Sequence, residues 1–230
     1  MAWTGKHGLR RSLAMVLLLS LCSAGGCLSR GAVQKQRFEV TLERESTAAG
    51  PGAGILRVSI VRAAPSFERK AFIYRRSDDT YVSDFYNEFF SAPGVMLREN
   101  LLRWLEASDI FEYVVAASDS NPDWILESRL EALYGDSRDA NHLSTEARLR
   151  FTLLDATQPR RPIVFQQSYE ARTEVAERKS DAYLRSVRVV LSEIFGKLEG
   201  DLRSAVEAHA ESGAAPPPGE GEVDETRGGQ

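Results

Sequence analysis

Cysteine is nearly absent from this sequence. The 230 residues include two, Cys22 and Cys27, and both lie close to the N-terminus. The chain after residue 27 therefore has no thiol that could form a disulfide, attack a substrate or bind a metal ion. The fold does not depend on a disulfide.

Histidine is almost as scarce, which limits acid–base and metal chemistry. Beyond the N-terminal segment the chain has only His142, in a polar connection, and His209, at the edge of the C-terminal tail. We interpret His142 as a solvated loop residue. The sequence also lacks an HExxH motif, a glycine-rich phosphate-binding loop and a set of cysteine ligands. We therefore predict no metal ion and no cofactor.

Pairs of carboxylates are the remaining route to catalysis, because two acids can hydrolyse a glycoside without histidine. The available pairs are Asp78 with Asp79, Asp136 with Asp139, and Glu127 with Glu131. Turn formation accounts for the first two pairs and the solvated face of a strand for the third. We predict no catalytic residue and no enzyme. The alternative, a lipid-anchored hydrolase, requires carboxylates that converge in a deep pocket.

Concentrated positive charge is missing as well. The formal net charge is −4, and it becomes −7 without the first 26 residues, which carry three basic groups and no acid. The last twenty residues hold five acids and one arginine, so the body of the chain is close to neutral. Nucleic-acid binding needs a concentrated basic face, and we predict none.

The sequence has no apolar run of the roughly 20 residues that a membrane-spanning helix needs. Its longest run, residues 12–21, follows Lys6, Arg10 and Arg11, and it ends in small residues directly before Cys27. This order of basic flank, short apolar core and small residues is typical of an export signal. We predict a signal peptide at residues 1–26, cleavage before Cys27, and membrane anchoring through lipid on that cysteine.

Alternatives to this cleavage site remain. Ala24 stands where the common lipobox has leucine, and simple cleavage with free secretion is the second interpretation. Cys22 is a rival lipidation site, but the bulky Leu21 precedes it directly. The pair Arg10–Arg11 lacks the flanking pattern of a twin-arginine signal, so we interpret it as an ordinary basic flank.

Composition divides the rest of the chain into three parts. Residues 27–35 are short and polar, as expected of a tether between lipid and domain. Residues 36–210 are periodic, and we predict one domain there. Residues 211–230 consist largely of Gly, Ala, Pro and Glu, and we predict a disordered tail, with a partner-binding tail as the alternative.

Strand signals dominate the domain. The first hairpin is predicted from 38–42 and 55–61, with Leu56, Val58 and Ile60 on one face. A second is predicted from 71–75 and 81–86, around a turn at Asp78–Asp79. Further strands are predicted at 112–116, 124–134, 148–153 and 163–173, as a meander of antiparallel character.

Two helices complete the predicted domain. The first runs from Pro93, with Ser91 as its cap, to about Ser108. The second runs from Ser180 to His209, and its apolar stripe comprises Leu184, Val187, Leu191, Ile194, Leu198 and Leu202. Within it, Gly196 and Gly200 indicate either close backbone approach or fraying. The predicted fold class is α/β (α+β): a two-layer sandwich of a mostly antiparallel mixed sheet with two main helices packed on one face.

Aromatic residues are unusually dense in one short stretch. They are Tyr81, Phe85, Tyr86, Phe89 and Phe90. Alternation along a strand can place only about half of them in the core. The others either cover the start of the first helix or form an exposed patch for a partner or for lipid. All five are candidate contact residues.

The same region resembles a known family. Ala71–Arg76, Tyr81–Tyr86, Phe89–Pro93, Met96–Leu97 and the stretch from Leu101 through Leu105 to Phe111 are similar to the auxiliary lipoproteins of ABC-type transport, the group that contains PqiC. The preceding strand Leu56–Ile60, the lipobox and the overall length also fit. The resemblance covers about 38–202, and its most specific part lies between Val58 and Phe111.

This resemblance implies a function without catalysis. It implies an outer-membrane lipoprotein on the periplasmic side that serves an intermembrane lipid-transport system, with a mammalian-cell-entry-domain protein and ABC transporter subunits as partners. Leu28 follows Cys27, where aspartate would signal retention at the inner membrane, so the outer membrane is expected. The alternative is a structural or assembly lipoprotein of the cell envelope with no transport role. No oligomeric state follows from the sequence.

Overall fold

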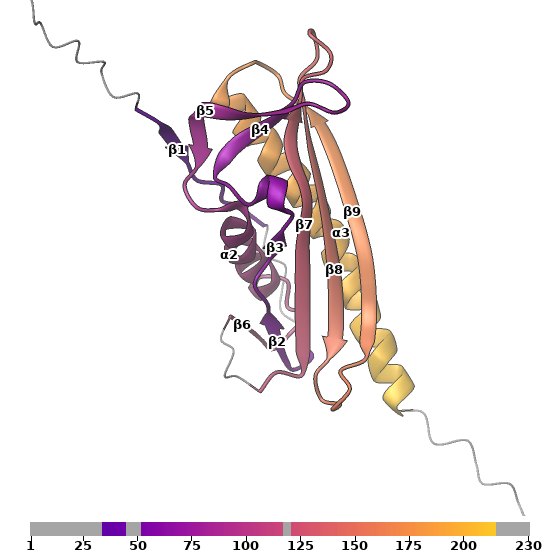
Figure 1. Ribbon diagram of the computed structural model, residues 1–230. Helices are drawn as coiled ribbons and strands as arrows, with labels where there is room; N and C mark the ends of the chain where they lie inside the picture. The colour runs from indigo at the N-terminus through magenta and orange to yellow at the C-terminus, as the bar shows by residue number, and fades with distance from the viewer. Residues whose placement is uncertain (1–33, 45–51, 117–120, 215–230) are drawn as a thin grey trace, which may run out of the picture. The chain divides into compact units, whose positions relative to one another are not determined.

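The computed structural model describes residues 34–44, 52–116 and 121–214 (Figure 1). The predicted signal peptide, Cys27 and most of the predicted tether lie outside these ranges, as does the tail beyond residue 214. The described residues contain nine strands in one sheet, two α-helices and one 3₁₀ turn. Both helices cover the same face of the sheet (Figure 1). The predicted α/β class with a mixed sheet is confirmed.

The strands and helices have the following bounds in chain order. The strands are β1 (Gln36–Phe38), β2 (Ile55–Val58), β3 (Arg62–Ala63), β4 (Ala71–Arg75), β5 (Tyr81–Phe89), β6 (Tyr113–Val115), β7 (Trp124–Asp136), β8 (Ser144–Asp155) and β9 (Ile163–Glu174). The 3₁₀ turn η1 spans Pro65–Phe67, and the helices are α2 (Pro93–Glu106) and α3 (Ser180–Ala214).

Strand β7 organises the sheet. On one side it pairs antiparallel with β8, which pairs antiparallel with β9. On its other side the short strands β2, β3 and β4 pair with it in succession, all of them parallel. Strand β5 pairs antiparallel with β4 and parallel with β1, while β6 pairs parallel with β2. The three long strands are thus antiparallel to one another, as predicted. Five of the eight strand pairings are parallel, so the prediction of a mostly antiparallel sheet is wrong.

The two predicted hairpins have different outcomes. The second is confirmed, because β4 and β5 pair antiparallel with Arg75 opposite Tyr81. The first is wrong, because β1 pairs with β5 and β2 pairs with β6 and β7. Local sequence patterns cannot predict these pairings, because the partner strands of β1 and β2 lie far along the chain.

The core lies between the sheet and the two helices. The predicted stripe of α3 is buried completely, and Trp104 of α2 meets Phe195 of α3 edge-on at a ring-centroid distance of 5.7 Å. Helix α2 begins at Pro93, as predicted, but its N-cap is Ala92 and no side chain caps it. Helix α3 continues to Ala214, so the predicted boundary at residue 210 falls inside the helix.

Candidate functional site

An irregularity with three extra residues in β5 sets the position of the predicted aromatic residues. Ala71 of β4 is opposite Glu88, whereas Ile73 is opposite Ser83, so two steps along β4 match five along β5. The three extra residues leave the regular ladder between the two strands. A bulge of this kind re-aims side chains that alternation would otherwise place on the two faces of the sheet.

Asp84 stabilises the bulge through its carboxylate. The carboxylate accepts hydrogen bonds from the backbone N–H of Tyr86 at 2.8 Å and of Asn87 at 3.0 Å. The side-chain amide of Asn87 donates a further bond to it at 2.9 Å. The turn is therefore built by its own side chains.

The bulge leaves most of the aromatic candidates exposed. The exposed fraction is 62% for Phe85, 58% for Tyr86 and 61% for Phe90. Tyr81 is 46% exposed, and its ring packs edge-on against Tyr134 at 5.4 Å. These four side chains are accessible to a partner or to lipid.

Phe89 is the exception and corrects the candidate set. It is only 2% exposed, and its ring lies 4.7 Å from that of Phe72 in the core. Pairing with β4 is regular again at Glu88, and the Phe89 side chain faces the core beside Phe72. Phe89 is a core residue, so it cannot serve as a contact residue.

Basic side chains of the β1 segment lie near the exposed aromatics of β5. We call Phe85, Tyr86 and Phe90 the β1-side aromatics. The Lys35 ammonium lies 5.9 Å from the centre of the Phe85 ring, and the N–H of Phe90 donates to the carbonyl of Phe38. Arg37 and Lys35 also bond the carboxylate of Glu88, at 3.0 and 3.1 Å, and these hydrogen bonds hold the pKa of Glu88 below its usual value.

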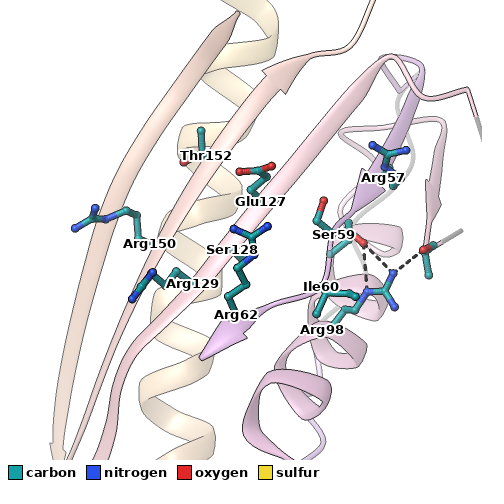
Figure 2. Close-up of a pocket in the computed structure, with 12 residues that line it drawn as sticks. Arg57, Ser59, Ile60, Arg62, Arg98, Glu127, Ser128, Arg129, Arg150 and Thr152 are labelled. Atoms are coloured by element: carbon teal, nitrogen blue, oxygen red, sulfur yellow. Dashed lines mark hydrogen bonds between the residues drawn. The ribbon is translucent and has the colours of Figure 1, made fainter. Parts of the chain in front are cut away.

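A second surface, on the face of the sheet that the helices leave uncovered, was not among the sequence predictions. It is a groove of about 850 Å³ between the end of β2 and strands β7 and β8 (Figure 2). Its lining includes five arginines and one carboxylate: Arg57, Arg62, Arg98, Arg129, Arg150 and Glu127. A neighbouring hollow of about 790 Å³ shares Ile60, Arg62, Arg98 and Arg129 with it.

A one-residue bulge between β2 and β3 shapes this groove. Val58 is opposite Leu126 and Arg62 is opposite Arg129, so four steps on one strand match three on β7. The prediction that Ile60 joins Leu56 and Val58 in the core is therefore wrong. Val61 is buried in its place, at 3% exposure, and Ile60 is 73% exposed at the groove. A single bulge carries no sequence signal that periodicity could detect.

Three arginines cross this face of the sheet in one row. In the strand register Arg62 of β3 is opposite Arg129 of β7, and Arg129 is opposite Arg150 of β8. Figure 2 shows these side chains on their adjacent strands. Only Arg150 has a carboxylate partner, Glu131 at 2.9 Å, and it also donates to Ser168 at 3.1 Å. Arg62 and Arg129 make no hydrogen bond or ion pair with any described residue.

Arg98 has a structural role in the same groove. Its guanidinium donates to the carbonyl oxygen of Val58, at 3.2 and 3.3 Å, and to that of Ala116 at 2.5 Å. These bonds, drawn in Figure 2, join the ends of β2 and β6 to α2. Arg98 thereby fixes the wall of the groove.

The acidic pairs considered for catalysis are mostly occupied by cations. Asp136 is bonded by Arg138 at 2.8 Å, which holds its pKa below the usual value, and Asp78 is bonded by the same arginine at 2.6 Å. Asp139 bonds His142 on an exposed connection, with 2.9 Å between the atoms. Glu131 pairs with Arg150, and Glu127 lines the arginine groove. Of these six carboxylates, the groove between β2, β7 and β8 contains Glu127 alone.

The described residues hold no cluster of three or more His, Cys, Asp or Glu side chains with metal-binding geometry. None of the helices within the described ranges is long and apolar enough to cross a bilayer.

Comparison with known proteins identifies the fold. No protein-family model matches the sequence, and no curated protein matches it significantly. The structure is similar to that of protein XCC0632 from Xanthomonas campestris, described as DUF330, with a TM-score of 0.68 and 15% identity over 76% of this chain and 99% of that one. It is also similar to an uncharacterized protein with a TM-score of 0.57 and 13% identity, over 75% of this chain and 99% of that one.

Solved structures with lower TM-scores are also similar over part of this chain. Lipoprotein GNA1162 from Neisseria meningitidis matches with a TM-score of 0.34 and 11% identity, over 62% of this chain and 98% of that one, which is too low to support an inference. The two stronger similarities establish a shared fold. At such low identity they assign no function.

Proposed function

We propose that this chain is a lipoprotein of the outer membrane that faces the periplasm. In this proposal it is a non-catalytic accessory component of an ABC transport system that moves lipid between membranes with a mammalian-cell-entry-domain protein. The observation that carries the proposal is the place of the β1-side aromatics. They lie in the segment that resembles the auxiliary lipoproteins, and beside the strand that follows the predicted lipid anchor.

The length of the tether supports contact between these aromatics and a bilayer. Eight residue steps separate Cys27 from Lys35, which is at most about 29 Å of extended chain. Lys35 directly precedes β1 and lies over the ring of Phe85. A lipid on Cys27 therefore keeps this edge of the domain close to the membrane.

The chemistry of the edge fits the interface between lipid and water. Tyrosine prefers the headgroup level of a bilayer, phenylalanine enters the boundary between headgroups and acyl chains, and lysine attracts anionic headgroups. Phe85, Tyr86 and Phe90 supply the rings, while Lys35 and Lys70 supply cations, the latter with its ammonium 2.8 Å from the carbonyl oxygen of Phe90.

Anchoring also explains how a domain without catalytic groups can act. Confinement to a membrane surface raises its concentration near other envelope proteins, so a weak protein interface becomes effective. The remaining surfaces of the sheet and helices stay free to meet a mammalian-cell-entry-domain protein.

Affinity capture from detergent-solubilised envelopes tests the proposed function. The native chain should retain a mammalian-cell-entry-domain protein together with transporter subunits, identified by mass spectrometry. Cys27→Ala should lose them, because the domain is no longer held at the membrane. Val189→Ala, at an exposed residue of α3, is the matched control and should retain them. Recovery of only outer-membrane assembly or peptidoglycan-associated proteins would contradict the transport role and favour a structural lipoprotein.

A further inference from the structure

The row of arginines across β3, β7 and β8 costs the fold free energy. Side chains directly opposite on adjacent strands, which lie about 4.8 Å apart, interact strongly, and like charges there are destabilising. Arg62, Arg129 and Arg150 occupy three such successive positions. Glu131 compensates only the last of them, at 2.9 Å.

The two uncompensated arginines lie in a groove and not on a flat surface. Arg62 and Arg129 line both the 850 Å³ groove and the hollow of about 790 Å³ beside it. Glu127 is the one acidic side chain in the lining of the larger groove, two residues before Arg129, and no described residue bonds it. The lining of the larger groove therefore keeps an excess of positive charge that an anion can neutralise. The neighbouring hollow has three arginines and two acids, Glu68 and Glu99, in its lining, so its excess of positive charge is smaller.

Apolar side chains adjoin the cations. Ile60 is 73% exposed because of the bulge between β2 and β3, and Val95 of α2 is 50% exposed. Both line the hollow that Arg62 and Arg129 also line. A ligand that fits this surface has an anionic group and an apolar part next to it.

We infer that the groove binds the phosphate group of a phospholipid, with Arg62 and Arg129 as its ligands and with Ile60 and Val95 against the adjoining apolar part. A tetrahedral phosphate offers oxygens in several directions, so arginines on two adjacent strands can each donate charge-assisted hydrogen bonds to it. The choice of a lipid as the source of the phosphate rests on the proposed function. The binding of phosphate rests on the arginine row alone.

Isothermal titration of the full chain, purified in the phosphate-free detergent dodecyl maltoside, tests this inference. The probes are dihexanoyl phosphatidylglycerol, inorganic phosphate, octyl glucoside and a synthetic peptide of residues 211–230 as an acidic peptide. The phosphatidylglycerol should bind at least about tenfold more tightly than inorganic phosphate, because it fills the apolar side as well. Octyl glucoside and the peptide should not compete.

Substitutions separate a binding role from a structural one. Arg129→Gln and Arg62→Gln should each weaken phosphatidylglycerol binding at least about tenfold. Each should also raise the Tm of the ligand-free chain by about 1–3 °C, because the repulsion within the row is relieved. Damage to the fold would lower the Tm. Arg160→Gln, at an exposed residue of the turn between β8 and β9, is the matched control and should leave binding unchanged.

Each contrary outcome has a defined meaning. Equal affinity for inorganic phosphate and phosphatidylglycerol would overturn the lipid assignment. Binding of the acidic peptide without phosphatidylglycerol, or no binding of any probe, would overturn the phosphate site. The titration contains no partner protein, so its failure is distinct from a failure of affinity capture.

Discussion

At the level of single residues, Gly196 and Gly200 lie in the interior of α3, where glycine is the least favourable residue after proline. Both were predicted to mark either close backbone approach or fraying. Both are exposed on α3, and an added Cβ would meet no atom within 4 Å at either position. Close approach is therefore excluded as the reason for these glycines, because a Cβ at either position would contact no described residue.

Replacement of either glycine by alanine should stabilise the domain. Gly196→Ala and Gly200→Ala each remove the entropy cost of glycine in a helix, so the free energy of unfolding should rise by about 0.5–1 kcal/mol. Urea denaturation measures this change. Gly52→Ala is the opposing control and should be destabilising, because its Cβ would lie 2.2 Å from the backbone of Phe111. A loss of stability in the α3 variants would show that the helix needs these glycines.

At the level of elements, the local patterns predict the β4–β5 hairpin and the antiparallel strands β7, β8 and β9, but not the partners of β1 and β2. Strict alternation predicted β7, in which Leu126 and Leu130 are buried while Glu127 and Arg129 are exposed. Spacing of 3 and 4 residues likewise predicted the buried stripe of α3. The parallel partners of β1 and β2 could not be predicted, because they depend on contacts between residues far apart in sequence.

The bulges explain why the candidate site was only partly predictable. Composition identified the dense aromatic stretch, but only the bulge at Asp84 decides that Phe85 is exposed while Phe89 is buried. The arginine row was missed for a similar reason. Arg62 and Arg129 lie 67 positions apart, and only the strand register brings them opposite each other.

The bulge between β2 and β3 makes a direct prediction about two adjacent residues. Val61→Ala should lower the free energy of unfolding by about 2 kcal/mol, because Val61 is 3% exposed in the core. Ile60→Ala should change it by less than about 0.5 kcal/mol, because Ile60 is 73% exposed. Urea unfolding of both variants measures the difference. The reverse order would place Ile60 in the core, as simple alternation predicted.

At the level of the whole molecule, one ion pair joins three distant segments. Arg44, which follows β1, donates to both carboxylate oxygens of Glu199 on α3, at 2.7 and 2.8 Å. Trp104 of α2 donates to the same carboxylate at 3.0 Å. The two charged side chains are only 10% and 17% exposed. The pair therefore fixes the chain after β1 against both helices.

Glu199→Gln should lower the free energy of unfolding by about 2–3 kcal/mol at pH 7, because it removes the negative charge that the half-buried Arg44 guanidinium contacts at 2.7 Å. Chemical denaturation measures the loss. Glu193→Gln is the matched control, since Glu193 pairs with Lys197 on the exposed side of α3, and it should cost less than about 0.5 kcal/mol. Equal effects of the two substitutions would show that the Arg44–Glu199 pair does not stabilise the fold more than an exposed ion pair does.

The same carboxylate should make stability depend on pH. Hydrogen bonds from Arg44 lower the pKa of Glu199 in the folded state. In the unfolded chain the pKa of this side chain is about 4.3. The stabilisation is therefore complete above that pH and is lost as the pH falls toward the lower folded pKa. Between pH 6 and pH 3, Glu199→Gln should lose less stability than the native chain. An identical pH dependence of the two proteins would show that Glu199 contributes nothing to it.

The central claim is that the lipid-anchored protein turns its β1-side aromatics toward the membrane. The sequence contains no cysteine after Cys27, so Phe85→Cys places the one cysteine of residues 28–230 at a site for a nitroxide spin label. The label is measured on the lipidated protein in vesicles of phosphatidylethanolamine and phosphatidylglycerol. Ile163→Cys, at an exposed residue of β9, is the matched control. The label at residue 85 should collide with lipid-dissolved oxygen more than with a water-soluble nickel reagent, and the label at residue 163 should do the opposite. Equal exposure of both labels to the nickel reagent would contradict the claim.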